Sequence, residues 1–178
     1  MLEKINYLTA GESHGRGLIG IIEGIPSNLE IDESFIKEQL SRRQKGYGRG
    51  SRMKIESDFA QIYSGVRHGI TIGAPIGLII ENKDFQNWED AMSVHKNKYN
   101  RKITLPRPGH ADLAGVLKYG FDDIRNVIER SSARETAMRV AIGAICRKFL
   151  SELNIDICSR VVQIFNIVDK SQIDSDLS

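Results

Sequence analysis

The clearest periodic pattern in the chain lies between residues 132 and 150. Large apolar side chains recur there at three- and four-residue intervals, at Met138, Ile142, Ile145 and Phe149. This spacing predicts a helix of about 18 residues. The opposite face of that helix is small, with alanines at Ala137, Ala141 and Ala144. Gly143 lowers helix stability by roughly 1 kcal/mol relative to alanine, so we expect it to allow close packing against a neighbour.

The start of this helix carries a capping-box sequence. Ser132 and Glu135 have the S-x-x-E spacing, in which the serine accepts from a free backbone N–H and the glutamate reaches back. The positive end of the helix dipole then points at residues 129–132, a favourable place for an anion. An arginine and two hydroxyls lie in that stretch, and the titratable His110 lies upstream on a Pro-Gly turn. This combination predicts a functional site.

Shorter patterns predict the other elements. Asp32 suits the N-cap of an amphipathic helix that ends near residue 42, and Gly120 suits the C-cap of a helix over 112–119. A nearly continuous apolar run at residues 18–24 predicts a well-buried strand. Further strands are expected at residues 6–10, 59–66, 75–81 and 155–167, the last with a bulge, and turns at 68–69 and 73. Residues 82–101 are polar around Trp88 and are expected to form a long connection.

Composition narrows the class of protein. The chain has 178 residues, 40% hydrophobic and 27% charged, as is ordinary for a soluble globular domain. Cys146 and Cys158 have no metal-ligand spacing and are expected to be buried, reduced thiols of an intracellular protein. No apolar run approaches the roughly 20 residues of a membrane span, and the start lacks the layout of a signal peptide. We therefore expect a cytoplasmic protein that takes no metal and does not bind a membrane.

Positive charge is concentrated in one stretch, although the net charge is only +2. The basic residues of this cluster are Arg42, Arg43, Lys45, Arg49, Arg52 and Lys54. Three interpretations fit it: a solvated face, a nucleic-acid contact, or a lid that neutralises small phosphorylated anions. Only Tyr47 adds an aromatic ring, which argues against an RNA-binding module. The glycines of the cluster neither follow a strand nor open a helix, so neither a P-loop nor a dinucleotide motif is supported.

Several motifs resemble those of the chorismate synthase family. The strongest are RPGHAD at residues 107–112 and ERSSARETA at 129–137. GESHG at 11–15, followed by GIP at 24–26, is similar to the N-terminal signature of the family, and RRQKGYGRG at 42–50, followed by RMKIE at 52–56, is similar to its basic loop. Shorter matches at 64–66, 73–76 and 81–82 keep the same order. The resemblance extends from about residue 7 to about residue 168.

This resemblance implies an α+β fold that is part of a β-α-β sandwich, in which antiparallel sheets pack around central helices. Residues 1–168 would form the N-terminal portion of the chorismate synthase-like domain. Residues 169–178 would be a polar tail at a truncation point, since members of the family continue further. The family also implies a homotetramer.

The resemblance implies an activity as well. Chorismate synthases are phosphorus–oxygen lyases that convert 5-enolpyruvylshikimate 3-phosphate to chorismate in the shikimate pathway, which leads to the aromatic amino acids. The reaction is a 1,4-anti elimination of phosphate that requires reduced FMN without net redox change, and NADPH is a candidate source of the electrons. The C-terminal half of the family supplies further flavin contacts and a proton-shuttling aspartate. We therefore expect this fragment to be inactive alone.

The family motifs imply roles for particular residues. His14 matches the histidine that protonates the departing phosphate, and His110 matches the histidine beside the flavin ring. Substrate contacts are implied for Arg43, Arg49 and Arg134, and flavin contacts for Arg130, Ser131 and Ser132. Arg139 is a further candidate for substrate contact, whereas His68 and His95 match no role. We expect the imidazoles and the guanidinium groups to face one shared cavity at the start of the long helix.

Plainer interpretations of the same residues stay open. Either histidine could be a turn residue bonded to local backbone, Ser132 a simple helix cap, and Arg134 a salt-bridge partner of Glu135 or another acid. Two other classes of function also stay open. One is a non-catalytic anion-binding remnant of the family, and the other is a nucleic-acid-binding module built on the basic cluster, whose binding would depend steeply on salt.

Overall fold

A computed structural model of the protein describes residues 4–45, 57–99 and 101–171. Its strands are β1 (Asn6–Gly11), β2 (Gly17–Glu23), β3 (Gln61–Ile62), β4 (Val66–Arg67), β5 (Ile70–Thr71), β6 (Ile76–Glu81), β7 (Gln163–Ile164) and β8 (Ile167–Val168). Its α-helices are α1 (Glu33–Gln44), α2 (Asp112–Tyr119), α3 (Arg125–Arg130) and α4 (Thr136–Ser151), and its 3₁₀ helices are η2 (Lys83–Asn87) and η3 (Ala133–Glu135).

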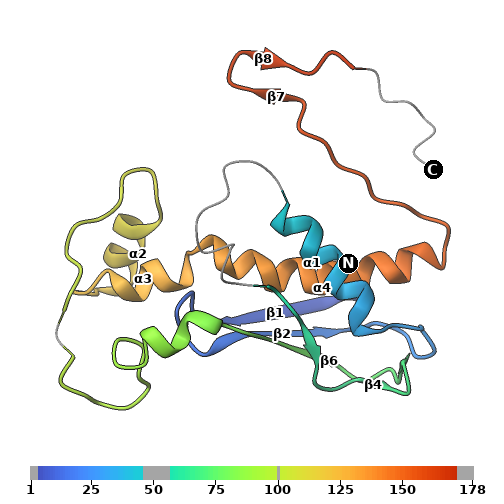
Figure 1. The fold of residues 1–178 in the computed structure, drawn as a ribbon, viewed down its shortest axis with the longest axis horizontal. Coiled ribbons are helices and arrows are strands. Elements are labelled where there is room, and N and C mark those ends of the chain that lie inside the picture. Colours follow the sequence, from blue (N-terminus) through green and yellow to red (C-terminus); the bar gives the residue numbers. More distant parts are fainter. Residues whose placement is uncertain (1–3, 46–56, 100, 172–178) are drawn as a thin grey trace.

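One antiparallel sheet supports the described part of the chain. Its strand order is β1-β2-β6-β3, and α4 and α1 cover one of its faces (Figure 1). Leu18 and Ile22 on β2 are buried in the hydrophobic core between the sheet and these helices. Ile19 and Ile21, which lie between them on the strand, are about half exposed. The expectation of a well-buried strand therefore holds for one face of β2 only. In the described residues, helices cover only one face of the sheet, so the apolar run is buried on alternate positions.

Close packing between the sheet and α4 occurs at a glycine of the sheet. A Cβ added to Gly20 on β2 would lie 2.5 Å from the sulfur of Met138, which is fully buried. Around Gly143 on α4, no heavy atom of the described residues comes within 4 Å of an added Cβ. The prediction that Gly143 allows close packing was therefore wrong, and Gly20 has that role instead.

Helix ends with local capping signals were predicted correctly. The side chain of Asp32 accepts a hydrogen bond from the N–H of Phe35 at 2.9 Å and so caps α1. Gly120 ends α2 in the left-handed conformation, with φ 68°. α4, with 16 residues, begins after the capped turn η3 rather than at Ser132 itself. α3 was not predicted.

The predicted strand at residues 155–167 was wrong. Only the exposed hairpin of β7 and β8 forms there, and the chain after α4 leads away from the sheet (Figure 1). Cys158 is exposed rather than buried, while Cys146 on α4 is partly buried. The mixed helix-and-sheet class with antiparallel sheets is confirmed. No helix in the described ranges is both long and apolar enough to cross a membrane.

Candidate functional site

His14 lies in the turn between β1 and β2 and is held by Glu129 of α3. Both carboxylate oxygens of Glu129 lie 3.0 Å from Nδ1 of His14, and the backbone N–H of His14 donates to Oε2 at 2.8 Å. The imidazole also stacks on Trp88, with ring centroids 3.9 Å apart. Since Nδ1 is the nitrogen bonded to Glu129, proton exchange with a ligand falls to Nε2.

His110 is held by a second carboxylate, that of Asp112 at the first turn of α2. Nδ1 of His110 lies 3.2 Å from Oδ1 of Asp112 and 3.1 Å from Nη2 of Arg107. The Arg107 guanidinium donates to both oxygens of this fully buried carboxylate, at 2.8 and 2.9 Å. These hydrogen bonds hold the pKa of Asp112 well below its usual range, so the carboxylate stays ionised beside the imidazole.

The two histidine–carboxylate pairs are close enough to influence one another. The pKa of Arg107 is raised, first by its hydrogen bond to Asp112 and to a smaller extent by the negative charges of Asp112 and Glu129. Arg107 therefore lies within electrostatic range of the carboxylate that holds His14. The site thus has two imidazoles, each on a buried carboxylate, with an arginine that responds to both acids.

Arg130 and Ser131 follow Glu129 directly and border a cavity beside α2 and α3. Nη2 of Arg130 donates to the carbonyl and the hydroxyl of Thr9 on β1, at 3.1 and 3.0 Å. The Ser131 hydroxyl donates to the carbonyl of Val127 at 2.6 Å. Both residues line a cavity of about 290 Å³ whose walls include Tyr119 and Phe121. A cation and a hydroxyl therefore lie beside an apolar wall.

The capping box forms only in part. The Ser132 hydroxyl accepts from the N–H of Arg134 at 3.3 Å, so the cap is confirmed, although it caps the 3₁₀ turn η3. The Glu135 carboxylate does not close the box. It accepts from the Thr9 hydroxyl at 2.8 Å and from Arg139 at 2.8 and 3.0 Å. The predicted return bond was wrong because β1 and the next turn of α4 supply stronger donors.

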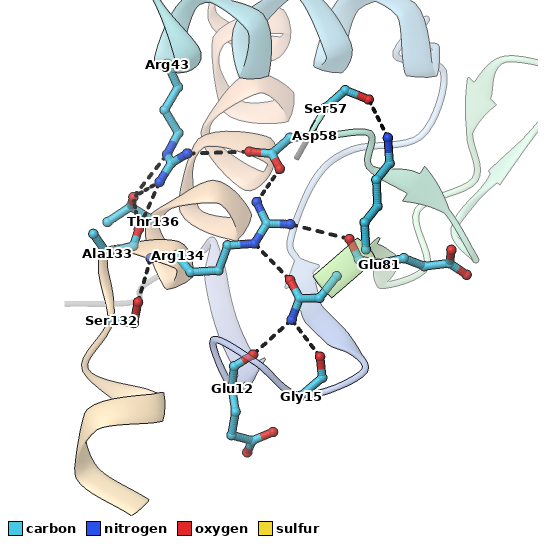
Figure 2. A network of polar contacts seen from close by, with 12 residues as sticks. Glu12, Gly15, Arg43, Ser57, Asp58, Glu81, Ser132, Ala133, Arg134 and Thr136 are labelled. Atoms are coloured by element: carbon cyan, nitrogen blue, oxygen red, sulfur yellow. Dashed lines mark hydrogen bonds and ion pairs between the residues drawn. The ribbon is translucent and has the colours of Figure 1, made fainter. Parts of the chain in front are cut away.

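Arg134 is the centre of a buried polar network (Figure 2). Its side chain is 5% exposed and pairs with the carboxylate of Asp58. Nε donates to Oδ1 of Asn82 at 2.8 Å, and the amide of Asn82 donates to the carbonyls of Glu12 and Gly15. The predicted direct substrate contact of Arg134 does not fit this geometry, since its donors point into the protein. The network instead ties the start of α4 to the turn that carries His14.

Arg43 joins α1 to the same network (Figure 2). Its guanidinium donates to the hydroxyl of Thr136 and, at 2.9 Å, to the carbonyl of Ala133, and lies 3.4 Å from Asp58. Arg43 also lines a cavity of about 780 Å³ between α1 and α4. Arg49, the other predicted contact from the basic cluster, lies outside the described residues, as do Arg52 and Lys54.

The predicted residues do not all face one cavity. Arg43 and Arg139 line the cavity of about 780 Å³, whereas Arg130 and Ser131 line the cavity of about 290 Å³. Neither His14 nor His110 lines either of these two. These two cavities therefore do not bring the predicted residues together, and the shared cavity stays a prediction. The short stretch of residues 129–135 contributes a hydrogen-bond partner to His14, Arg43 and Arg139, whereas the partners of His110 are Arg107 and Asp112.

Several contributors were missed from the sequence. Glu129, Asp58 and Asn82 are buried polar residues that hold the predicted ones, and Trp88 and Arg125 surround His14. A weak signal existed for two of them, since Glu129 begins the ERSSARETA motif and Trp88 is the only tryptophan. His68 and His95 lie in a hairpin turn and a loop, as expected.

Comparison with known proteins agrees with this set of motifs. The family described as chorismate synthase matches residues 5–177. The chain is 60% identical over 162 residues to a protein of Streptococcus equi subsp. equi named chorismate synthase, covering 89% of this chain and 42% of the relative. A namesake from Aquifex aeolicus is 56% identical over 165 residues, covering 92% and 42%.

A solved structure is similar as well. The crystal structure of a chorismate synthase superposes with a TM-score of 0.65 at 45% identity, covering 86% of this chain and 36% of that one. The chain thus spans about 42% of the length of the curated relatives described above.

Proposed function

Because the chain belongs to the chorismate synthase family, we propose that it supplies the N-terminal part of an active site that converts 5-enolpyruvylshikimate 3-phosphate to chorismate. One observation carries the proposal. In the two family motifs, His14 is held through Nδ1 by the buried carboxylate of Glu129, and Nδ1 of His110 lies 3.1 Å from the Arg107 guanidinium and 3.2 Å from the buried carboxylate of Asp112. Paired in this way, an imidazole can hold a proton at a fixed position near neutral pH.

His14 would serve the departing phosphate. The elimination breaks a carbon–oxygen bond to phosphate, and the leaving oxygen gains a proton as its charge develops. With Nδ1 bonded to Glu129 at 3.0 Å, Nε2 is the atom of His14 that would deliver this proton.

The cavity beside α2 and α3 is the proposed place for reduced FMN. Arg130 and Ser131 offer a cation and a hydroxyl, and Tyr119 and Phe121 offer an apolar wall, which together suit an anionic aromatic cofactor. Ala111, next to His110 in the chain, lines the same cavity. When bound, the reduced flavin supplies transient electron density to the substrate. His110 would hold or release the proton of the flavin, and Ser132 would act mainly as the helix cap.

Substrate binding requires cations, because the substrate carries a phosphate and carboxylates. Arg43 and Arg49 are proposed as contacts, and Arg139, 54% exposed, is a further candidate. Arg134 would act indirectly. Its ion pair with Asp58 would hold Arg43 and the start of α4 in position.

The remaining features follow from the family. We propose that residues 1–168 form the N-terminal portion of one domain, that the β-α-β sandwich is completed by residues equivalent to the rest of the relatives, and that the chain described here is inactive alone. A homotetramer in the cytoplasm, with NADPH as the source of the electrons, belongs to the same proposal.

An anaerobic assay of the full-length protein with reduced FMN and 5-enolpyruvylshikimate 3-phosphate tests the proposal, with chorismate and phosphate as readouts. His14→Ala and His110→Ala should each lower kcat by roughly 10²–10⁴-fold while the fold is retained. His95→Ala, in an exposed loop, is the matched control and should keep wild-type turnover. Near-normal turnover in either site variant would remove that role. A wild-type protein that binds the substrate without turnover would instead identify a non-catalytic remnant.

A further inference from the structure

We propose that Glu129 is the positioning residue of His14 and that it fixes which ring nitrogen of His14 is free to exchange a proton. This inference rests on the proposed function, because it assigns a partner to the histidine that serves the phosphate. The motif resemblance gives Glu129 no role of its own, and the proposed function uses it only as the partner of Nδ1.

The contacts between the two residues are unusually complete. The Glu129 side chain is 2% exposed, and both of its oxygens lie 3.0 Å from Nδ1 of His14. The same carboxylate accepts from the backbone N–H of His14 at 2.8 Å. The carbonyl of Glu129 accepts from the N–H of Ser13 at 3.0 Å. One residue of α3 therefore fixes both the backbone and the ring of a turn that lies 115 positions away in the sequence.

The chemistry of a carboxylate decides the tautomer of the ring. An ionised carboxylate only accepts hydrogen bonds, so Nδ1 must carry a proton, and in the neutral ring Nε2 must be the unprotonated nitrogen. When the ring takes a second proton, that proton is on Nε2 and the positive charge faces Glu129. The buried acid thus makes His14 a donor through Nε2 alone.

A closed set of contacts holds Glu129 itself. Nη1 of Arg125, one turn earlier on α3, lies 3.7 Å from Oε1 of Glu129. The Arg125 guanidinium lies 5.3 Å from the ring centroid of Trp88, which stacks on His14 at 3.9 Å. The charged groups that face Glu129 are therefore Arg125 on its own helix, His14 from the turn, and Arg107 at longer range.

Arg125 interacts through its charge and its planar guanidinium group, and its set of hydrogen bonds is incomplete. Its Nε is the one buried side-chain polar atom without a hydrogen-bond partner found in the part of the chain that the structure describes. Leaving such a donor unsatisfied destabilises the fold. The stack on Trp88 and the charge of Glu129 offset that loss, and together they hold the carboxylate against the imidazole.

A purely structural role for Glu129 predicts a different result. If the carboxylate only docked the turn, Glu129→Gln would keep most contacts, because the amide oxygen still accepts from Nδ1–H or from the His14 N–H. Catalysis would then be nearly unchanged. If the negative charge and the tautomer matter, the same near-isosteric change must slow proton transfer.

The experiment compares Glu129→Gln in the full-length protein with Glu152→Gln. Glu152 is an exposed acid at the C-terminal end of α4. Glu129→Gln should lower kcat by roughly 10²–10³-fold with little change in the substrate KM. The basic limb of its kcat profile should move to lower pH, because the protonated ring loses an adjacent negative charge. Glu152→Gln should match the wild type. Glu129→Asp, which restores the charge, should recover part of the lost turnover and of the pH profile.

Failure of this inference is distinguishable from failure of the proposed function. If His14→Ala is inactive while Glu129→Gln keeps the wild-type kcat and pH profile, the positioning role is overturned and the role of His14 stands. If His14→Ala is active, the role of His14 is overturned and this inference with it.

The combined variant His14→Ala/Glu129→Gln should be no slower than His14→Ala alone, since Glu129 acts through His14. An additive loss would overturn that route. If Glu129→Gln does not fold, Glu129→Asp carries the test, because its shorter side chain moves the carboxylate away from Nδ1. A kcat below that of the wild type but above that of His14→Ala would support the positioning role, and a kcat equal to that of the wild type would overturn it.

Discussion

Removing the carboxylate of Asp58 is the most direct test of the buried network. The Asp58 side chain is fully buried, and it pairs with Arg134, whose side chain is 5% exposed. Arg43 approaches the other carboxylate oxygen at 3.4 Å (Figure 2). Asp58→Ala would therefore leave two arginines beside an apolar methyl group, one of them deep in the protein.

The size of the effect follows from that burial. Removing one partner of a buried ion pair typically destabilises a protein by about 3–5 kcal/mol, because the other charge stays desolvated. Arg134 keeps its bonds to Asn82 and to the carbonyl of Glu81, and Arg43 keeps those to Thr136. We therefore expect the lower end, about 3 kcal/mol, which is roughly a 10²-fold shift in the unfolding equilibrium.

Urea unfolding of the full-length protein, followed by circular dichroism, measures this change. The control is Asp122→Ala, which breaks an ion pair whose side chains are 80% and 54% exposed and should leave the unfolding free energy nearly unchanged. The double variant Asp58→Ala/Arg134→Met should be more stable than Asp58→Ala alone, because it also removes the stranded charge. The reasoning is refuted if Asp58→Ala is no more destabilising than Asp122→Ala, or if the added Arg134→Met change gives no recovery.

Two further predictions concern pH and packing. The pKa of Asp112 is lowered by its hydrogen bonds to Arg107, so this carboxylate stabilises the fold above its unfolded pKa of about 3.9 and the stabilisation is lost as the pH falls below that value. Asp112→Asn should be less stable at pH 7 and should lose less stability between pH 5 and 2 than the wild type, as measured by urea unfolding at each pH. Gly20→Val should destabilise the fold by about 1–3 kcal/mol, because its Cβ would meet Met138. Gly143→Ala should stabilise the fold by up to about 1 kcal/mol, because alanine favours the helix and meets no neighbour there among the described residues. Equal melting temperatures for the two variants would contradict this prediction.

Elements whose signals are local could be predicted from the sequence. The cap at Asp32 and the glycine at Gly120 set the ends of two helices, because each acts within a few residues of itself. α3 was missed because its signal is indirect. Asp123 accepts from the N–H of Arg125 at 3.0 Å and from that of Ile103 at 3.1 Å. One carboxylate therefore bonds both the first residue of α3 and a loop residue that lies 20 positions before Asp123. Six residues are also too few to display an apolar repeat.

Burial on the two sides of an element could not be predicted in the same way. The apolar run on β2 is compatible with a strand covered on both faces or on one, and only the position of α4 decides between them. The same holds for the glycines. Gly143 lies in a helix and Gly20 in a strand, and the sequence does not indicate which of them meets a neighbour. Such contacts depend on residues more than 100 positions apart.

The candidate site was predictable as a set of residues but not as a set of partners. The motifs identified His14, His110 and the arginines, yet the acids that hold them were left unassigned. Glu129 and His14 are 115 residues apart, and Arg134 and Asp58 are 76 apart. A local pattern favours nearby partners, which is why Glu135 was expected to close a capping box and in fact bonds Thr9.

The dense charge of residues 129–135 has a physical explanation in the break between two helices. α3 ends at Arg130 and η3 begins at Ala133, so the stretch does not continue as one helix with one buried stripe. Glu129 and Arg134 are consequently both buried, yet they reach different neighbours, the turn at His14 and the carboxylate of Asp58. Not every charge in the stretch has a distant partner, because Arg130 and Glu135 lie 3.7 Å apart. The break lets Glu129 and Arg134 face different parts of the protein, while the Ser132 hydroxyl caps η3 and the Ser131 hydroxyl donates to the carbonyl of Val127 at the end of α3.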